Sequence, residues 1–173
     1  MFGYGLDRFS EDLDFDSHYK ITSSSLINML QSLNCKDIHI KKDTDTTKRI
    51  MAVFDDVSIK IEVSLRNNAE FQGKNLMGNI SIYSLDALAN MKMDAFENRT
   101  TARDIFDLGF IVYHKQDELS SKTKNRFLDK FGKVDFVDLL LSSELTFKED
   151  NILTEGDLFE SIARLRKGIG HLM

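Results

Sequence analysis

The sequence predicts an α+β fold in which a small mixed or antiparallel sheet is followed by a helical half. Apolar and polar residues alternate in several segments of residues 1–83, which is typical of half-buried strands. From residue 84 onward the apolar residues recur with a period near 3.6, which is typical of amphipathic helices. A length of 173 residues without an internal repeat or linker predicts a single domain over residues 1–173.

Strands are predicted where the alternation is clearest, beginning close to the N-terminus. The expected strands are Leu13–Phe15, Asp37–Lys42, Arg49–Phe54, Val57–Leu65 and Leu76–Tyr83. Asp55-Asp56 supplies a tight two-residue turn between the third and fourth of them. Residues 67–75 are mostly polar and contain a glycine, so we expect a loop there.

One helix is predicted among the strands and five after them. Ser23-Ser24-Ser25 precedes an apolar stripe at helical spacing that ends at Leu33, and serines are common helix caps. The later helices are expected at Leu85–Asn98, Ala102–His114, Ser121–Phe131, Asp135–Ser142 and Glu155–Lys167.

The composition is that of an ordinary globular chain and excludes several classes of protein. The chain has 28 acidic and 23 basic residues, a net charge of −5, and 42% hydrophobic residues, which excludes disordered and collagen-like chains. Cys35 is the single cysteine, so an intrachain disulfide is impossible. Without a membrane-length apolar run or a basic and apolar leader at the N-terminus, we expect a cytoplasmic protein.

Two aspartates near the N-terminus form the first candidate site. If Leu13 and Phe15 face the core of a strand, Asp12 and Asp14 lie together on its other face, about 7 Å apart. Such a pair can share a divalent ion, for which Mg²⁺ with a substrate phosphate is the usual case. The alternative is a group of solvated acids. An EF-hand is excluded, because Ser17 replaces the glycine that its loop requires.

A third carboxylate lies on the strand with the clearest alternation. Ile59, Ile61 and Val63 share the apolar face of this strand, which leaves Lys60 and Glu62 on the other face. If the strand neighbours that of Asp12, Glu62 completes a set of three carboxylates of the kind that holds two Mg²⁺ ions for phosphoryl transfer. The alternative is an exposed glutamate paired with a lysine.

The helical half contributes further charged candidates. Lys92 lies on the same helical stripe as Leu88 and Phe96, where a lysine either extends toward solvent or neutralises a phosphate. Asp104 and Asp107 are three residues apart and therefore share a helix face. Asp104 also fits the third position of a helix that Thr101 caps, a purely structural role.

A basic cluster offers a possible surface for RNA despite the acidic net charge. It consists of Lys122, Lys124, Arg126, Lys130 and Lys133. Lysine and arginine supply most of the affinity for nucleic-acid phosphates. The alternative is an ordinary solvated helix face.

Three motifs together give a family resemblance. RFSEDLDF (residues 8–15), IKIEV (59–63) and KMDAFENRTTARDIFDL (92–108) occur in the order and approximate spacing of one family and span over half of the chain. The chain thus resembles the AbiEii/AbiGii-type nucleotidyltransferase toxins, a branch of the polymerase-β-like superfamily found in type IV toxin–antitoxin and phage-defence systems. The resemblance implies a nucleotidyltransferase sheet followed by the helical half.

The resemblance also implies an activity and its cofactors. Members of the family transfer a nucleotide from an NTP onto RNA, in some cases onto the acceptor end of tRNA. An acceptor hydroxyl attacks the α-phosphate and pyrophosphate leaves, with Mg²⁺ or Mn²⁺ bridging the phosphates. The family pattern implies that Asp12 and Asp14 bind the metal and the nucleotide and that Glu62 is the third metal-binding carboxylate.

In the helical half the same resemblance places the remaining site residues. It implies that Lys92 contacts the nucleotide phosphates and that Asp104 and Asp107 belong to the last active-site motif. We further expect Lys60 and Arg99 to take part in nucleotide binding.

The N-terminus departs from the family pattern. Members normally carry a Gly-Gly-Thr-Ala or Gly-Ser block that cradles the triphosphate just before the first motif, whereas this chain begins MFGYGL. We therefore expect an N-terminally shortened member in which Gly3 and Gly5 are the remnant of that block. Two functions follow: a Mg²⁺-dependent nucleotidyltransferase with an RNA or protein acceptor and an antitoxin partner, or a catalytically inactive binding or regulatory protein of the same fold. Another metal-dependent transfer, such as that of a nucleotide sugar, leaves Lys92 without a role.

Overall fold

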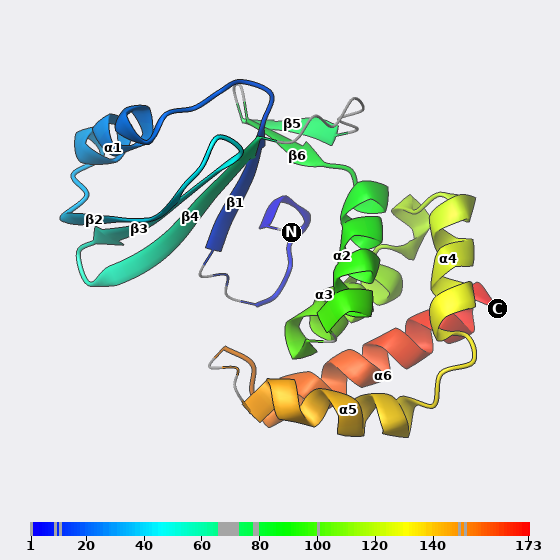
Figure 1. Cartoon of the computed structure of the whole chain (residues 1–173). Coiled ribbons are helices and arrows are strands. Elements are labelled where there is room, and N and C mark those ends of the chain that lie inside the picture. Colours follow the sequence, from blue (N-terminus) through cyan, green and yellow to red (C-terminus); the bar gives the residue numbers. More distant parts are fainter. Residues whose placement is uncertain are drawn as a thin grey trace. The chain divides into compact units, whose positions relative to one another are not determined.

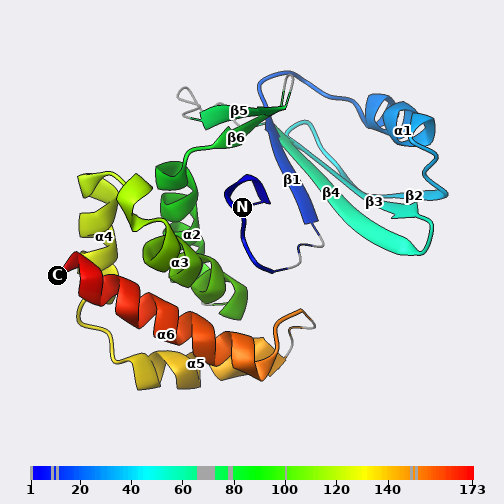
Figure 2. The ribbon, with the colours of Figure 1, turned by 180° about the vertical axis from the view of Figure 1, so that it is seen from behind.

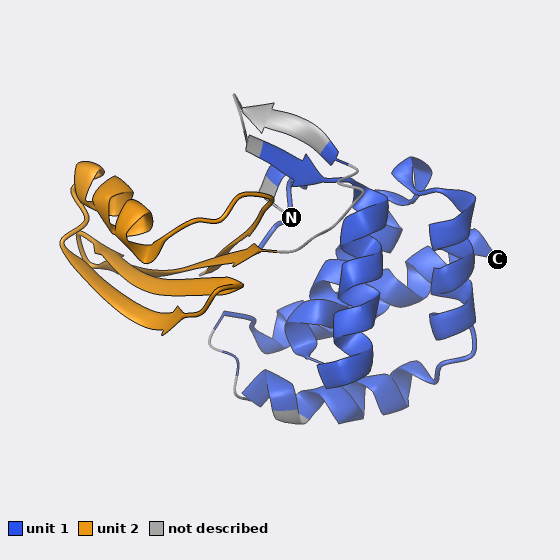
Figure 3. Ribbon diagram, turned by 45° about the horizontal axis from the view of Figure 1, so that its top comes forward, with its two compact units in different colours: residues 1–8, 72–173 blue, residues 9–71 orange. Residues whose placement is uncertain are grey.

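The chain forms two compact units. The computed structural model describes residues 2–8, 10, 12–65, 73–77, 80–99, 101–148, 150 and 152–173. Residues 9–71 form the sheet unit, and residues 1–8 with 72–173 form the helical unit (Figure 3). The single domain expected from the length stays a prediction.

The sheet unit contains a four-stranded mixed sheet and one helix. Its elements are β1 (Asp12–Ser17), α1 (Ser23–Ser32), β2 (Asp37–Asp43), β3 (Thr47–Phe54) and β4 (Val57–Leu65). The strand order is β1-β4-β3-β2, in which β1 and β4 are parallel and the other neighbours antiparallel (Figure 1). The predicted mixed sheet is therefore confirmed, and β1 adjoins the strand of Glu62 as the site prediction requires.

One face of this sheet is the core of the unit. Its buried members come from β3, β4 and α1, and they are Ile50, Ala52, Ile61, Val63, Leu26 and Leu30. Thr22 caps α1, since its side chain accepts a hydrogen bond from the backbone N–H of Ser25. The predicted turn at Asp55-Asp56 is also present, with Phe54 paired to Val57 and Asp55 in the left-handed region at φ 51°.

The expectation that Leu13 and Phe15 are buried is wrong. The register pairs them with Ile61 and Val63, so they lie on the apolar face, but their side chains are 45% and 43% exposed. The reason is that β1 is an edge strand, and the core formed with α1 does not include its side chains.

The single strand predicted over residues 76–83 is also wrong. Two antiparallel strands, β5 (Gly73–Met77) and β6 (Ile80–Tyr83), occupy this region, so residues 73–75 of the predicted loop belong to a strand. The intervening sequence Gly78-Asn79 is a pair typical of two-residue hairpin turns, a signal that the alternation concealed. These two residues, like residues 67–72 of the predicted loop, lie outside the described residues.

The helical unit contains five longer helices and two 3₁₀ turns in its described residues. They are η1 (Phe2–Tyr4), α2 (Leu85–Arg99), α3 (Ala102–His114), η2 (Gln116–Glu118), α4 (Ser121–Phe131), α5 (Phe136–Lys148) and α6 (Glu155–Leu172). The last two extend beyond their predicted ends. Gly168 and Gly170 resemble helix-end signals, but Ile169 and Leu172 continue the apolar stripe of α6 and pack on the core. None of the described helices combines the length and apolar character needed to span a membrane.

Helix α3 is the centre of this unit. It is buried along almost its whole length, from Asp104 through Val112, and contacts both α2 and α6. Its contact with α6 is close because two glycines lie in it. A Cβ at Gly109 would come 2.6 Å from the Ser161 carbonyl oxygen, and one at Gly168 would come 2.6 Å from Val112 Cγ1. The two backbones therefore approach at a distance that side chains would prevent.

We predict that Gly168→Ala destabilises the protein by about 2 kcal/mol, the usual cost of overpacking a core. The added methyl group would also lie 2.8 Å from the Val112 carbonyl carbon, which cannot move without shifting α3. Urea denaturation followed by circular dichroism measures this change in the free energy of unfolding.

Gly170→Ala is the matched control for this prediction. Gly170 lies in the same helix, but a Cβ there meets no atom within 4 Å. This variant should gain about 0.5 kcal/mol, since alanine favours helix more than glycine does. Equal effects of the two variants would show that helix propensity, not close packing, explains the glycine at residue 168.

Candidate functional site

Acidic side chains gather on the face of the sheet opposite the core. The parallel register pairs Asp12 with Lys60 and Asp14 with Glu62, so these four side chains share that face. Two carboxylates thus lie side by side on neighbouring strands, which are about 4.8 Å apart, and a third lies two residues along β1. Like charges in such positions destabilise a sheet unless cations compensate them.

Two cations of the same face provide this compensation. The Lys60 ammonium lies 2.5 Å from Asp12 Oδ2, and Arg49 Nε donates to Glu62 Oε2 at 2.6 Å. All four of these side chains are partly exposed to solvent. The face is therefore a solvent-accessible surface on which charges of both signs alternate.

The chemistry of the carboxylates suits a divalent metal ion. Mg²⁺ and Mn²⁺ prefer oxygen ligands of this kind. Among the residues that the structure describes, however, no group of three or more Asp, Glu, His or Cys side chains is arranged to hold a metal. Asp12 is turned toward Lys60, and Glu62 is turned toward Arg49. Metal binding would require both carboxylates to exchange these cations for the metal, and the metal site stays a prediction.

A second cluster of charges lies inside the helical unit. Asp104 and Asp107 are fully buried on α3, which is unusual for aspartate. Lys92 of α2 bridges them, with its Nζ 3.2 Å from Asp104 Oδ1 and 2.6 Å from Asp107 Oδ2. Arg99 donates to both oxygens of Asp104 at 2.8 and 3.0 Å, and Arg8 donates to both oxygens of Asp107 at 2.8 Å. We call these five residues the buried ion-pair network.

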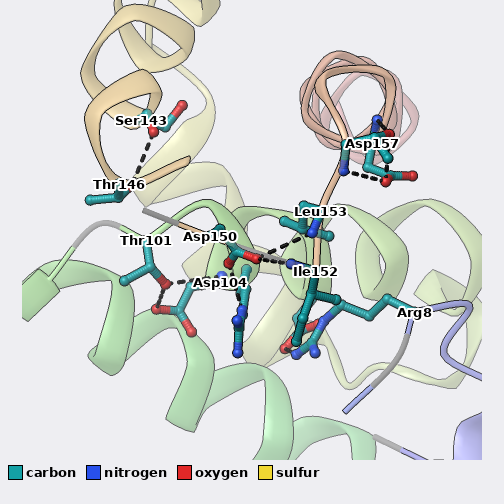
Figure 4. Close-up of polar contacts among 12 residues, drawn as sticks. Arg8, Thr101, Asp104, Ser143, Thr146, Asp150, Ile152, Leu153 and Asp157 are labelled. Carbon is teal, nitrogen blue, oxygen red and sulfur yellow. Dashed lines mark hydrogen bonds and ion pairs between the residues drawn. The ribbon is translucent and has the colours of Figure 1, made fainter. Parts of the chain in front are cut away.

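Asp104 is the most heavily bonded member of the network. Thr101 caps α3 as predicted, since its hydroxyl oxygen accepts from the Asp104 N–H and the hydroxyl group donates to Asp104 Oδ2 at 2.6 Å (Figure 4). Burial by itself raises the pKa of Asp104. The hydrogen bond from Arg99, the charge of Lys92 and the Thr101 hydroxyl outweigh burial, so the pKa lies below its ordinary value.

Arg8 fastens the N-terminal segment to the helices. Its side chain is only 11% exposed, and its guanidinium forms the two-pronged pair with Asp107 that arginine makes best. Asp7 pairs with Arg164 of α6, and the Tyr4 hydroxyl donates to the carbonyl oxygen of Tyr83 at 2.8 Å. Gly5 lies between these contacts at φ +75°, a conformation that other residues rarely adopt. The structure thus gives Gly5 a conformational role, and triphosphate binding by Gly3 and Gly5 stays a prediction.

The loop before α6 is fastened to α3 in a similar way. The Asp150 carboxylate accepts from Arg103 Nε at 2.5 Å and from the backbone N–H groups of Ile152 and Leu153 (Figure 4). Burial raises the pKa of Asp150, but these hydrogen bonds outweigh it and lower the pKa overall. Arg103 therefore has a structural partner outside the buried ion-pair network.

The basic cluster on and after α4 is only partly available to a ligand. Arg126 pairs with Asp94 of α2 and also donates to Asn90 Oδ1 at 2.7 Å. Lys130 pairs with Glu97 and lies over the ring of Phe96. Within the described part of the chain, the other three lysines, at positions 122, 124 and 133, have no acidic partner.

The structure thus brings the predicted site residues into two groups, one in each unit. Asp12, Asp14, Lys60 and Glu62 share one sheet face, and Lys92, Arg99, Asp104 and Asp107 meet in the buried ion-pair network. Sequence reasoning missed the partners Arg49 and Arg8. The first could have been found, because the turn at Asp55-Asp56 fixes a register in which Arg49 pairs with Glu62. Arg8 and Asp107 are 99 residues apart, and no local pattern connects them.

We predict that Asp104→Asn lowers the free energy of unfolding by about 3 kcal/mol at pH 7, because it removes the charge of a fully buried carboxylate with which Lys92 and Arg99 are paired. Since the pKa of Asp104 is lowered in the folded state, its stabilisation is complete above about pH 4 and is lost as the pH falls through the folded pKa. The difference from the wild type should therefore shrink in acid. Urea denaturation at neutral and acidic pH measures it.

Asp117→Asn serves as the control for this prediction. Asp117 is an exposed aspartate of η2, outside the network, and its loss should change stability by less than about 0.5 kcal/mol. A constant difference between wild type and Asp104→Asn at all pH values would contradict the electrostatic explanation.

Comparison with known proteins agrees with the residue pattern. A family model described as nucleotidyl transferase AbiEii toxin, type IV toxin–antitoxin system, matches residues 1–166. The crystal structure of JHP933 from Helicobacter pylori is 33% identical with a TM-score of 0.81, and the match covers 99% of this chain and 78% of that one. A second H. pylori crystal structure, provisionally described as a nucleotidyltransferase, is 33% identical with a TM-score of 0.80 and 99% and 81% coverage.

Among curated proteins, none matches the sequence significantly. The family model nevertheless covers nearly the whole chain, and both solved structures share its fold over almost its full length. The resemblance carried by the three motifs is thereby confirmed. This chain belongs to the AbiEii family of nucleotidyltransferase toxins of type IV toxin–antitoxin systems.

Proposed function

We propose that the protein transfers a nucleotide from an NTP to the hydroxyl group of an acceptor molecule. RNA, and tRNA in particular, is the first candidate acceptor, and a protein is the second. The observation that carries this proposal is the row formed by Asp14 and Glu62 on neighbouring parallel strands, with Asp12 on the same face. Three oxygen ligands in such a row suit the divalent metal ions of phosphoryl transfer. Family membership supports an NTP substrate and an antitoxin partner.

The proposed reaction is a displacement at the α-phosphorus of the NTP. The acceptor oxygen forms a new bond to phosphorus, the bond to the β-phosphate oxygen breaks, and pyrophosphate leaves with that electron pair. The hydroxyl proton passes to a carboxylate of the acidic face or to water. Asp12, Asp14 and Glu62 would hold Mg²⁺ or Mn²⁺, which when bound neutralises the charge on the phosphates.

Lys60 and Arg49 add a condition to this proposal. Each is paired with a carboxylate that the metal would need as a ligand, so metal and nucleotide must together displace the two cations from these carboxylates. Once displaced, both cations remain close to the site and can pair with phosphate oxygens instead. Such an exchange of partners keeps the charge of the face balanced before and after the nucleotide binds.

In the helical unit, Lys92 is the residue that supports phosphate binding. Two donors of its ammonium group are directed to Asp104 and Asp107, which leaves a third, and its side chain is 23% exposed. The buried ion-pair network contains three cations and two carboxylates, so it carries a net positive charge. Both facts favour an anion, and the family pattern assigns this lysine to the nucleotide phosphates.

An inactive binding or regulatory protein is the second candidate. The same contacts of Lys60 and Arg49 favour it, since a face whose charges are already balanced needs no metal for stability. The two candidates differ in whether the acidic face supports turnover or only folding.

We predict that the wild type incorporates label from at least one of the four α-³²P-labelled NTPs into total bacterial RNA, with Mg²⁺ or Mn²⁺. Asp14→Asn should reduce the rate at least about a hundredfold, because it removes a ligand of the metal that stabilises the transition state. Filter binding of the labelled RNA measures the rate.

Asp45→Asn is the matched control, since Asp45 belongs to the same unit but its side chain is 94% exposed and lies in the turn after β2. It should retain full activity. Wild-type protein that incorporates no nucleotide with either metal would overturn the enzymatic proposal and leave the binding protein. Equal activity of Asp14→Asn and Asp45→Asn would remove the acidic face from the mechanism.

We predict that changing the three available lysines to glutamine weakens RNA binding and lowers its salt dependence by about two units of slope. The variant is Lys122→Gln, Lys124→Gln, Lys133→Gln. Fluorescence anisotropy of a labelled RNA at several salt concentrations measures both quantities.

The control for the lysine prediction replaces three exposed lysines that already have acidic partners, which are Lys20, Lys36 and Lys148. It removes the same total charge but should change the slope much less. If both triple variants bind RNA equally well, the lysines around α4 are not the RNA surface.

A further inference from the structure

A groove of about 510 Å³ lies between α5 and α6, which run alongside each other in the helical unit (Figures 1 and 2). Its lining includes Val137 and Leu140 of α5 and Phe159, Ile162, Arg166 and Lys167 of α6. Residues 159, 162 and 166 lie three or four positions apart, so they form one stripe along α6. The groove is thus apolar along its length and basic at the C-terminal part of α6.

Large apolar side chains border this groove and remain open to solvent. Val137 is 64% exposed, Phe159 is 60% exposed, and Leu141, one turn after Val137, is 59% exposed. Exposed apolar residues on a monomer are normally scattered singly. Two of them in the lining of one groove, with Leu141 one turn further along α5, indicate a surface that another apolar surface covers.

The charges beside the groove lack partners. Most cations of the helical unit form ion pairs, as Arg103 and Arg164 do. Within the described part of the chain, Arg166 and Lys167 have no acidic partner, and Asp138 has no cationic one. Asp138 follows Val137 and lies one helical turn before Leu141, so it flanks the exposed apolar ridge of α5.

We propose that this groove binds a second copy of the same chain, in a two-fold symmetric dimer. This surface of α5 and α6 carries both halves of such a contact. One half is the groove with its basic residues, and the other is the apolar ridge of α5 with Asp138 beside it. In a two-fold contact, the ridge of Val137 and Leu141 enters the groove of the second copy, and the reverse holds equally. Asp138 then meets Arg166 and Lys167 of the second copy, so the unpaired charges of both signs are satisfied twice.

An unrelated partner would need to supply only the acidic ridge, and the structure gives no reason for this chain to carry one as well. A small apolar ligand would use the groove but would leave Leu141 and Asp138 unexplained. Self-association accounts for the groove, the ridge and the unpaired charges together.

The test is the mass of the full chain in solution, measured by light scattering from about 1 to about 100 µM, where interfaces of modest affinity dissociate. We expect the mass to rise toward twice the 19.9 kDa of one chain. Asp138→Lys should weaken the dimer at least about tenfold, because it places a lysine opposite Arg166 and Lys167 at both symmetric contacts. Asp117→Lys, an exposed charge reversal elsewhere in the unit, should leave the dimer unchanged.

A charge exchange makes the test specific. Arg166→Glu with Lys167→Glu should dissociate the dimer, and adding Asp138→Lys to that variant should restore it. Circular dichroism of each variant separates dissociation from misfolding. A wild type that stays at the mass of one chain at every concentration, whether or not the groove binds an apolar dye, would overturn the proposal. So would an Asp138→Lys variant that dimerises like the wild type.

Discussion

The burial of two carboxylates in the N-terminal half of α3 is the constraint on which the helical unit depends. An ionised aspartate without a partner is too costly to bury, so Asp104 and Asp107 require cations at fixed positions. Those cations come from α2 and from the N-terminal segment, which the network therefore holds against α3. The same contacts leave Lys92 with a spare donor near the surface. A single electrostatic requirement thus links the packing of this unit to the lysine proposed to bind phosphate.

The sheet face solves a related problem in a different way. Its carboxylates are partly exposed, so the cations beside them compensate repulsion and do not offset a full desolvation cost. Pairs of this kind contribute little to stability, and their side chains can change partners at a small energetic cost. That difference matters for function. A buried network is suited to fixing a structure, whereas a solvated row of alternating charges is suited to binding a metal and a nucleotide that replace its own cations.

Much of this structure could be expected from local patterns. Four of the five predicted strands, the turn at Asp55-Asp56 and the Thr101 cap rest on contacts between residues near one another in the chain, and these are confirmed. Local patterns gave wrong predictions where the outcome depends on which other elements pack against a strand or helix. Leu13 and Phe15 follow the alternation of a buried strand but lie on an edge strand, and the helix-end signal at Gly168 proved to be a close contact with α3.

The sequence by itself determined the family and the fold class, and it predicted which residue types carry the chemistry, because motifs and periodicity depend on order along the chain. It placed Asp12 and Asp14 on one face, since side chains alternate along any strand. Only the tertiary structure decided what those residues meet. The parallel pairing of β1 with β4 brought Glu62 beside Asp14, and the return of the N-terminal segment brought Arg8 to Asp107. Contacts between residues far apart in the chain depend on packing, for which a single sequence has no local signal.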